Sequence, residues 1–216
     1  MNRYSIISIA VILIAIYLNG TKGLAGKKAD YFLVKNQHSV NYYLLTLKDN
    51  KMRTDTTINM VTTRIFNAPL EQVWKSWSTE EMVKQWWGPK GFTCPFAKII
   101  FQEGKASLVC MRAPKEYGGH DMYNTWTYQK IVPMERIEYI LNFTDKDGNK
   151  VDPSAMGMPR GIPKDVPHLI TFKDLGNSKT EVTVTEYGYT SAEVVALSKA
   201  GMNECLDKMA EALEKH

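Results

Sequence analysis

Residues 56–216 are predicted to form one α+β domain in which a curved antiparallel sheet wraps a long C-terminal helix. A first extended segment precedes two short amphipathic segments. Three pairs of extended segments follow, joined at turn-forming residues, and the chain closes with a long apolar stripe of helical period. The chain has 216 residues, of which 44% are hydrophobic, and this suffices for one packed core.

The first strand and two short helices are expected at the start of this domain. β-branched and apolar residues dominate 57–66, as is typical of a strand. Ser78-x-x-Glu81 predicts a capping box for the second helix, which Gly88-Pro89 ends. The first helix has apolar residues at the spacing of one helix face: Leu70, Val73, Trp74 and Trp77.

Three hairpins are expected next. The first turns at Glu103-Gly104, which would pair Ala97 with Cys110. The others turn at Pro133-Met134 and Gly176-Asn177. The second arm of the middle hairpin alternates strictly, so one of its faces is expected to be apolar: Ile137, Tyr139, Leu141 and Phe143.

The last helix is expected to begin at a second capping box, Thr190-x-x-Glu193. Gly201 interrupts good helix formers at a cost of about 1 kcal/mol relative to alanine. A glycine here indicates either the close approach of a neighbour or a gap left for another molecule. The apolar stripe runs down one face: Val195, Met202, Leu206, Met209 and Leu213.

The charge distribution argues against nucleic-acid binding, and the cysteine content indicates the redox compartment. The net charge is +4, but the excess of Lys and Arg lies in the first 53 residues, so the domain is near neutral. It lacks the basic stripe that a nucleic acid requires, and no nucleic-acid partner is expected. The three cysteines include no CxxC pair, which favours free buried thiols and a reducing, cytoplasmic compartment.

The N-terminal part allows several interpretations. Residues 4–18 are an apolar run preceded by Arg3, which suits a signal segment better than the ~20 residues of a spanning helix. We therefore divide the chain into an apolar segment (1–26), a linker (27–55) and the domain (56–216). If 4–18 is genuine, the protein is exported or membrane-anchored. Met52 could instead be the natural start, with the preceding residues an extension.

Several sequence motifs resemble those of one family, both in their residues and in their order along the chain. Together the motifs resemble the C-terminal domain of the activator of the heat-shock-protein-90 (Hsp90) ATPase, a branch of the START-like (SRPBCC) superfamily. They cover about residues 56–213. The segments that carry the resemblance are Arg64–Pro69, Val73-Trp74, Trp86–Phe92, Met111–Pro114, Ile131–Arg136 and Leu206–Met209.

The resemblance implies the helix-grip fold, in which the sheet wraps the last helix and leaves a cavity between them. This chain departs from the family pattern at three places: Lys98-Ile99-Ile100 stands where acids are common, Gly104-Lys105 replaces two glycines, and Gly201-Met202 replaces a Gly-Trp pair. Each departure alters the cavity or a strand beside it, so no ligand is carried over from the family.

The candidate ligand cavity is built from the fifth strand and the last helix. Such sites are mostly apolar, and the methionines would give an adaptable wall. The same residues could instead fill the core completely. Trp126 and Tyr128 share one strand face, which is either the cavity wall or the outer surface of the sheet. Trp86 and Trp87 are expected to anchor the second helix to the sheet. The candidate lining residues are Tyr139, Leu141, Phe143, Met202, Cys205 and Met209.

The long irregular connection from Asp145 to Pro167 is a candidate lid. It is rich in proline and glycine, and loops of this length in compact domains often cover binding sites. Met156 and Met158 would lie over the cavity mouth. A solvated surface loop is the alternative.

Catalytic and metal motifs are sparse. His120-Asp121 could act as acid and base but could equally be a surface pair, and Cys205 has no clear base. There is no G-x-S-x-G, P-loop or dinucleotide signature, so neither a metal nor a cofactor is expected. The four histidines are scattered without metal-ligand spacing: His38, His120, His168 and His216.

Three functions follow from these observations. The first is a non-catalytic module that holds a small apolar ligand or assists a protein partner. The second is a cyclase- or aromatase-like enzyme, which would need polar residues deep in the cavity, with Tyr128 or Asn142 as candidates. The third is a co-chaperone for the heat-shock ATPase, which ranks last because residues 1–55 do not read as a second folded domain.

Overall fold

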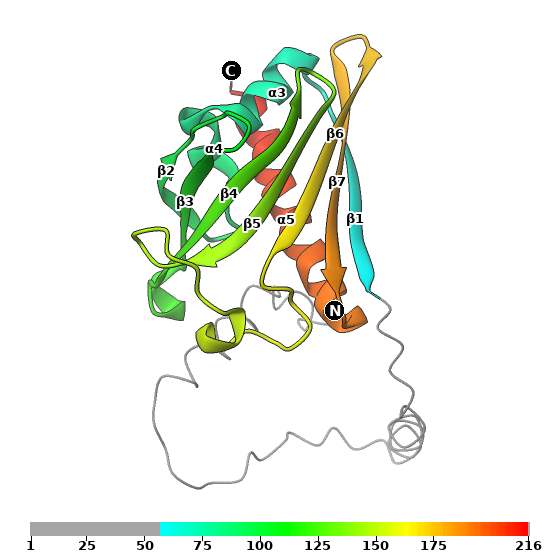
Figure 1. The fold of residues 1–216 in the computed structure, drawn as a ribbon. Coiled ribbons are helices and arrows are strands. Elements are labelled where there is room, and N and C mark those ends of the chain that lie inside the picture. The colour runs from blue at the N-terminus through cyan, green and yellow to red at the C-terminus, as the bar shows by residue number, and fades with distance from the viewer. Residues whose placement is uncertain (1–56, 216) are drawn as a thin grey trace, which may run out of the picture. The chain divides into compact units, whose positions relative to one another are not determined.

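The computed structural model describes residues 57–215, which form a seven-stranded antiparallel sheet, two short helices and one long helix (Figure 1). This confirms the predicted fold class. The predictions for the segments 1–26 and 27–55, including the apolar run and Met52, lie outside the described residues. Among residues 57–215 no helix is long and apolar enough to cross a membrane.

The strands follow the order β1-β7-β6-β5-β4-β3-β2. β1 and β2 are the two edge strands of the sheet. Only the helices α3 and α4 separate them along the chain, so these helices connect the two edges. The strands are β1 (Ile58–Phe66), β2 (Thr93–Lys98), β3 (Ala106–Arg112), β4 (Asp121–Val132), β5 (Arg136–Thr144), β6 (Val166–Gly176) and β7 (Lys179–Tyr189).

Alternation along β4 and β5 sends their large aromatic side chains to the inner face. Trp126 and Tyr128 are each 1% exposed, which settles that their shared face is the inner one. Trp126 pairs with Leu141 and Tyr128 with Tyr139, and the Trp126 and Tyr139 rings stack with centroids 5.3 Å apart. This face therefore forms part of the core, which decides between the two alternatives that the alternating pattern left open.

The helices α3 (Leu70–Ser78) and α4 (Glu80–Trp86) cover one part of the inner face. Trp86 is fully buried, and its Nε1 donates to the Ser76 carbonyl oxygen at 2.7 Å, which ties the two helices together. The predicted cap is wrong by one residue. Thr79, not Ser78, is the N-cap of α4, and its hydroxyl accepts from the Met82 backbone N–H.

The first hairpin also differs from its prediction by one position. Ala97 pairs with Val109 and Phe96 with Cys110, and the register shifts between Thr93 and Phe96. The turn itself lies at Glu103-Gly104 as predicted, since the Lys105 N–H donates to the Gln102 carbonyl oxygen at 3.0 Å. The Gly104 N–H also donates to the Tyr128 carbonyl oxygen of β4, at 2.8 Å. The second hairpin turns at residues 133–135, which include the predicted Pro133-Met134. The third turns at Asn177-Ser178, one residue beyond the predicted Gly176-Asn177, because Gly176 still pairs with Lys179.

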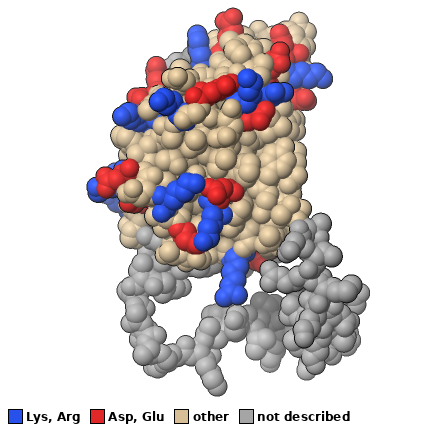
Figure 2. Space-filling view, viewed as in Figure 1, with Lys and Arg blue, Asp and Glu red and all other residues tan. Residues whose placement is uncertain are grey.

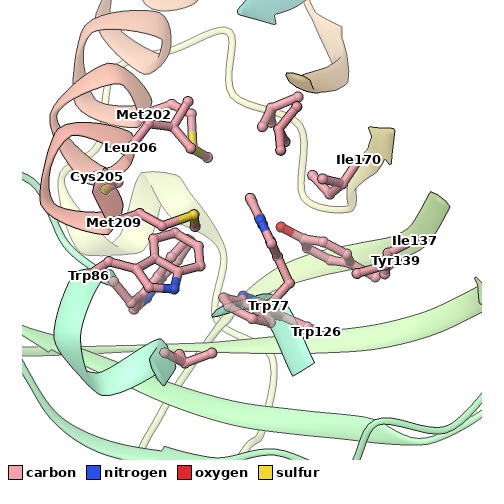
Figure 3. Packing of buried hydrophobic residues seen from close by; sticks show 14 of the residues in the cluster. Trp77, Trp86, Trp126, Ile137, Tyr139, Ile170, Met202, Cys205, Leu206 and Met209 are labelled. Atoms are coloured by element: carbon pink, nitrogen blue, oxygen red, sulfur yellow. The ribbon is translucent and has the colours of Figure 1, made fainter. Parts of the chain in front are cut away.

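The long helix α5 (Ala192–Leu213) lies across the inner face and contacts β1, β7, α3 and α4. Its N-cap is Ser191, so the second capping box is also displaced by one residue from the predicted Thr190. Figure 3 shows the buried side chains of α5 pointing toward the aromatic residues of the sheet and of α4. They are Met202, Cys205, Leu206 and Met209.

The outer face of the sheet carries few charges. In Figure 2 the Lys, Arg, Asp and Glu side chains gather toward the two ends of the domain, with both signs interspersed, and the band between them is uncharged. The outward side chains in the middle of β6 and β7 are likewise uncharged: Leu169, Thr171, Thr183 and Thr185.

We predict that replacing Thr79 with alanine lowers the free energy of unfolding by about 1 kcal/mol, because the α4 cap is lost. The measurement is urea unfolding of the full chain. Ser78→Ala is the matched control, since the Ser78 hydroxyl donates only to the Trp74 carbonyl one turn back. A larger loss in Ser78→Ala than in Thr79→Ala would contradict the assigned cap.

Candidate functional site

A cavity of about 190 Å³ lies between α5, the inner face of the sheet and the connection of residues 145–165. Its walls are mainly apolar, with polar side chains concentrated on β6, β7 and α5. The lining includes Trp87, Phe92, Met111, Leu141, Phe143, Met156, Met158, Ile162, Met202 and Cys205, together with the polar residues Asn124, His168, Glu186, Tyr189 and Ser198.

The structure separates the six predicted lining residues into two groups. Leu141, Phe143, Met202 and Cys205 line the cavity. Tyr139 and Met209 are fully buried among neighbouring side chains instead: the Tyr139 ring stacks on the His168 ring with centroids 4.6 Å apart, and Met209 packs in the core near Trp86 (Figure 3). A role for any of them in ligand binding stays a prediction.

Gly201 leaves open space on the cavity side of α5. A Cβ atom added at this position would have no heavy atom within 4 Å, so no neighbour approaches the helix closely here. Of the two explanations for this glycine, the gap is therefore the one that the structure supports. Ser198, Met202 and Cys205 follow the same helix face and extend the cavity wall.

The connection of residues 145–165 contributes Met156 and Met158 to the cavity wall. It contains a 3₁₀ turn (Pro153–Met156) and is fastened at several points. The Asn142 side-chain Nδ2 donates to the Lys164 carbonyl oxygen at 2.9 Å, and the Thr190 N–H donates to the Gly161 carbonyl oxygen at 3.0 Å. Asn142, a candidate cavity residue, thus holds the end of this connection and does not line the cavity.

Four polar side chains form one buried cluster on the cavity wall. His168 on β6 lies directly opposite Glu186 on β7, and their Nε2 and Oε1 atoms are 3.3 Å apart. The second carboxylate oxygen, Oε2, accepts from the Tyr189 hydroxyl and from the Ser198 hydroxyl of α5, the latter at 2.5 Å. The His168 and Glu186 side chains are only 1% and 5% exposed.

A bulge in the sheet brings Glu186 and Tyr189 to the same face. β7 pairs with β1 through Met60 and Glu186, and the register shifts before Ile58 meets Tyr189. Gly188 adopts a φ of +93° in this bulge, a conformation that favours glycine. Without the extra residue, strict alternation would turn Tyr189 outward, away from Glu186.

Hydrogen-bond geometry fixes the proton positions in this cluster. The His168 Nδ1 atom lies 2.9 Å from the Val166 carbonyl oxygen, which can only accept, so Nδ1 carries a proton. Burial disfavours the charged form of Glu186, but the charge on His168 and the bonds from His168, Ser198 and Tyr189 outweigh it and lower the pKa of the carboxyl. The bonds from its three neighbours therefore favour the carboxylate form of Glu186.

The other side chains considered for catalysis form structural contacts or are buried. Asp121 forms a two-point ion pair with Arg112, at 2.5 and 2.8 Å, so the His120-Asp121 acid–base hypothesis finds no support in this geometry. Burial raises the pKa of the Cys205 thiol to about 12, which keeps it neutral and unreactive. All three cysteines are free and buried, and residues 57–215 contain no cluster of three metal-binding side chains.

The fold and the cavity define a START-like domain of the SRPBCC superfamily. The profile of the family described as "Activator of Hsp90 ATPase homolog 1-like protein" matches residues 67–214, and the chain belongs to this family. The comparison with curated proteins gives no match.

Solved structures share the architecture at low sequence identity. A protein from Arthrobacter aurescens is 19% identical with a TM-score of 0.61, and the match covers 76% of this chain and 91% of that one. For a Staphylococcus epidermidis protein these values are 24%, 0.59, 76% and 93%. For the AHSA1 protein of Silicibacter pomeroyi they are 15%, 0.59, 74% and 100%. At such identities the likeness shows the fold alone.

We predict that Glu186→Gln lowers the free energy of unfolding by about 3 kcal/mol at pH 7, because it breaks the buried pair with His168. The folded-state pKa of Glu186 is lowered, so its stabilisation is present above the unfolded value of about 4.3 and is lost as the pH falls through the folded value. Urea unfolding between pH 7 and pH 3 measures both effects.

Glu181→Gln is the matched control for this substitution, since Glu181 lies on the outer side of the same strand. Its effect should stay within about 0.5 kcal/mol. Equal losses in the two variants, or a loss in Glu186→Gln that does not shrink in acid, would contradict the buried pair.

We predict that Gly161→Ala loosens residues 145–165 from α5. Gly161 has a φ of +110°, and an added Cβ would lie 2.8 Å from the Ser191 Cβ. Limited trypsin digestion should then cleave faster after the exposed Arg160. Gly148→Ala controls for backbone strain alone, because its φ is +85° and its added Cβ meets no atom closer than 3.9 Å. Equal cleavage in both variants would contradict the contact.

Proposed function

We propose that this protein binds a small, largely apolar molecule in the cavity between α5 and the sheet. The observation that carries the proposal is the open space opposite Gly201 within an otherwise densely packed inner face. Protein interiors leave few voids larger than a water molecule, so a cavity of about 190 Å³ needs an explanation.

The size of the cavity limits the ligand. An apolar cavity of about 150 Å³ in another protein holds benzene. The present cavity therefore suits one aromatic ring with a short substituent, or an aliphatic molecule of similar bulk. Met156, Met158 and Met202 supply flexible side chains on two sides of this space, which favours adjustment to such a ligand.

The lid hypothesis fits the same proposal. Residues 145–165 close one side of the cavity, and their attachments to Asn142 and Thr190 both follow the two methionines in the chain. Entry of a ligand would require this connection to move, which is the gating role known for such loops.

We predict that Met202→Trp fills the cavity and weakens ligand binding at least about tenfold, while the domain stays folded. The larger ring would occupy the space beside Gly201, so the loss comes from excluded volume. Calorimetric titration of the full chain with toluene measures the affinity, and circular dichroism checks the fold. Leu175→Trp, on the exposed end of β6, is the control for adding a tryptophan.

Native mass spectrometry of the protein purified from its own host tests the proposal directly. A bound molecule of low mass, absent from Met202→Trp, is the expected result. If the wild-type protein carries nothing and toluene does not bind, the proposal is wrong.

An enzyme of the cyclase or aromatase type is the second candidate, favoured by one observation. Such an enzyme needs ordered polar groups in the cavity, and the His168–Glu186 pair with Tyr189 and Ser198 provides them. Tyr128 does not line the cavity, since its hydroxyl lies 3.3 Å from the Ser107 Oγ outside it. Release of a bound host-derived molecule in chemically altered form on incubation would favour this candidate.

A further inference from the structure

The polar cluster on the cavity wall has no free hydrogen-bond donor. The two ring nitrogens of His168 are both occupied, Nδ1 by the Val166 carbonyl oxygen at 2.9 Å and Nε2 by the Glu186 Oε1 atom at 3.3 Å. The Tyr189 and Ser198 hydroxyls each have one proton, and both protons point to the Glu186 Oε2 atom. Every proton of these four side chains is therefore held within the cluster.

The same cluster keeps unused acceptor capacity. Each carboxylate oxygen can accept about two hydrogen bonds, and the Glu186 Oε1 atom receives one, from His168. The Tyr189 and Ser198 hydroxyl oxygens lie 3.1 Å apart, and each has a lone pair left after its proton is donated. All four residues line the cavity, so these acceptors border the space that a ligand would occupy.

The charge of the cluster is also balanced. The carboxylate of Glu186 pairs with His168, and no other charged side chain of residues 57–215 lines the cavity. A cation placed beside the cluster would add an uncompensated buried charge, and an anion there would meet only the acceptors of the cluster. Both are costly in a site of low polarity.

We propose that the cavity selects a neutral molecule with a hydroxyl group, which donates its proton to the wall formed by Glu186, Tyr189 and Ser198. This inference rests on the proposed function and specifies its ligand: a small alcohol or phenol with an apolar body. A ketone, an aldehyde or a carboxylate of the same shape lacks the proton that the wall requires, and an acceptor pressed against acceptors is repelled.

The test uses four probes of nearly equal size on the full chain: ethylbenzene, benzyl alcohol, benzaldehyde and benzylamine. Calorimetric titration at pH 7 gives each affinity. Benzyl alcohol should bind at least about tenfold more tightly than benzaldehyde, the ratio expected for one hydrogen bond against one unpaired acceptor. The protonated amine should bind more weakly than the alcohol.

Variants of the wall connect the selectivity to these residues. Ser198→Ala and Tyr189→Phe each remove one acceptor oxygen and should reduce the ratio of alcohol to aldehyde affinity severalfold, while ethylbenzene binding stays unchanged. Two separate variants keep the test valid if one fails to fold. Ser78→Ala removes a hydroxyl outside the cavity and should leave the ratio unaltered.

The outcomes separate the two proposals. If ethylbenzene binds but benzaldehyde equals or exceeds benzyl alcohol, the hydroxyl inference is overturned and the ligand-binding function stands. Tighter binding of benzylamine than of benzyl alcohol overturns the inference in favour of a cationic ligand. Failure of all four probes to bind overturns both.

Discussion

The rest of the structure depends on how the inner face of a seven-stranded sheet is covered. Strands spaced about 4.8 Å apart make such a sheet roughly 29 Å wide, whereas a helix with its side chains is about 10–12 Å across. α5 alone cannot cover this face. The tryptophans of α3 and α4 fill one part of the remaining area, and residues 145–165 close another. The cavity lies where these covers meet, beside the one position of α5 that has no side chain.

The buried ion pair lies at the border of this incompletely filled region. A buried pair of this kind is weak evidence for stability, because apolar residues of similar volume often stabilise a core as well or better. Perturbed titratable groups beside a cavity are more often found where a ligand is recognised. The Gly188 bulge turns Tyr189 toward the same carboxylate, and Ser198 reaches it from the helix. Sheet, bulge and helix thus contribute to one polar wall, which supports a recognition role.

Periodic patterns predicted the elements well, because each signal depends on only a few neighbouring residues. The alternating face of β5, the stripe of α5 and the order of motifs are all of this kind. Local caps were displaced by one residue at both helices because Ser78-Thr79 and Thr190-Ser191 each place two hydroxyl residues side by side, and the backbone entry angle decides between them. The hairpin of β2 and β3 slipped by one position because its turn residues bond to β4, a contact far away in the sequence.

The polar wall was missed for a related reason. The two-residue turn at Asn177-Ser178 alone would set His168 opposite Tyr187, and a register shift between Asp174 and Gly176 places it opposite Glu186 instead. The pairing of these two inward polar residues therefore could not be found from the turn. Tyr189 was out of reach, because its orientation depends on a bulge, and so was Ser198, because it depends on how α5 crosses the sheet. Crystals of the protein exposed to pressurised xenon test the central claim of an open cavity most directly. Xenon is expected between Gly201 and Leu141; a cavity without xenon, filled by repositioned methionines, would contradict the open cavity.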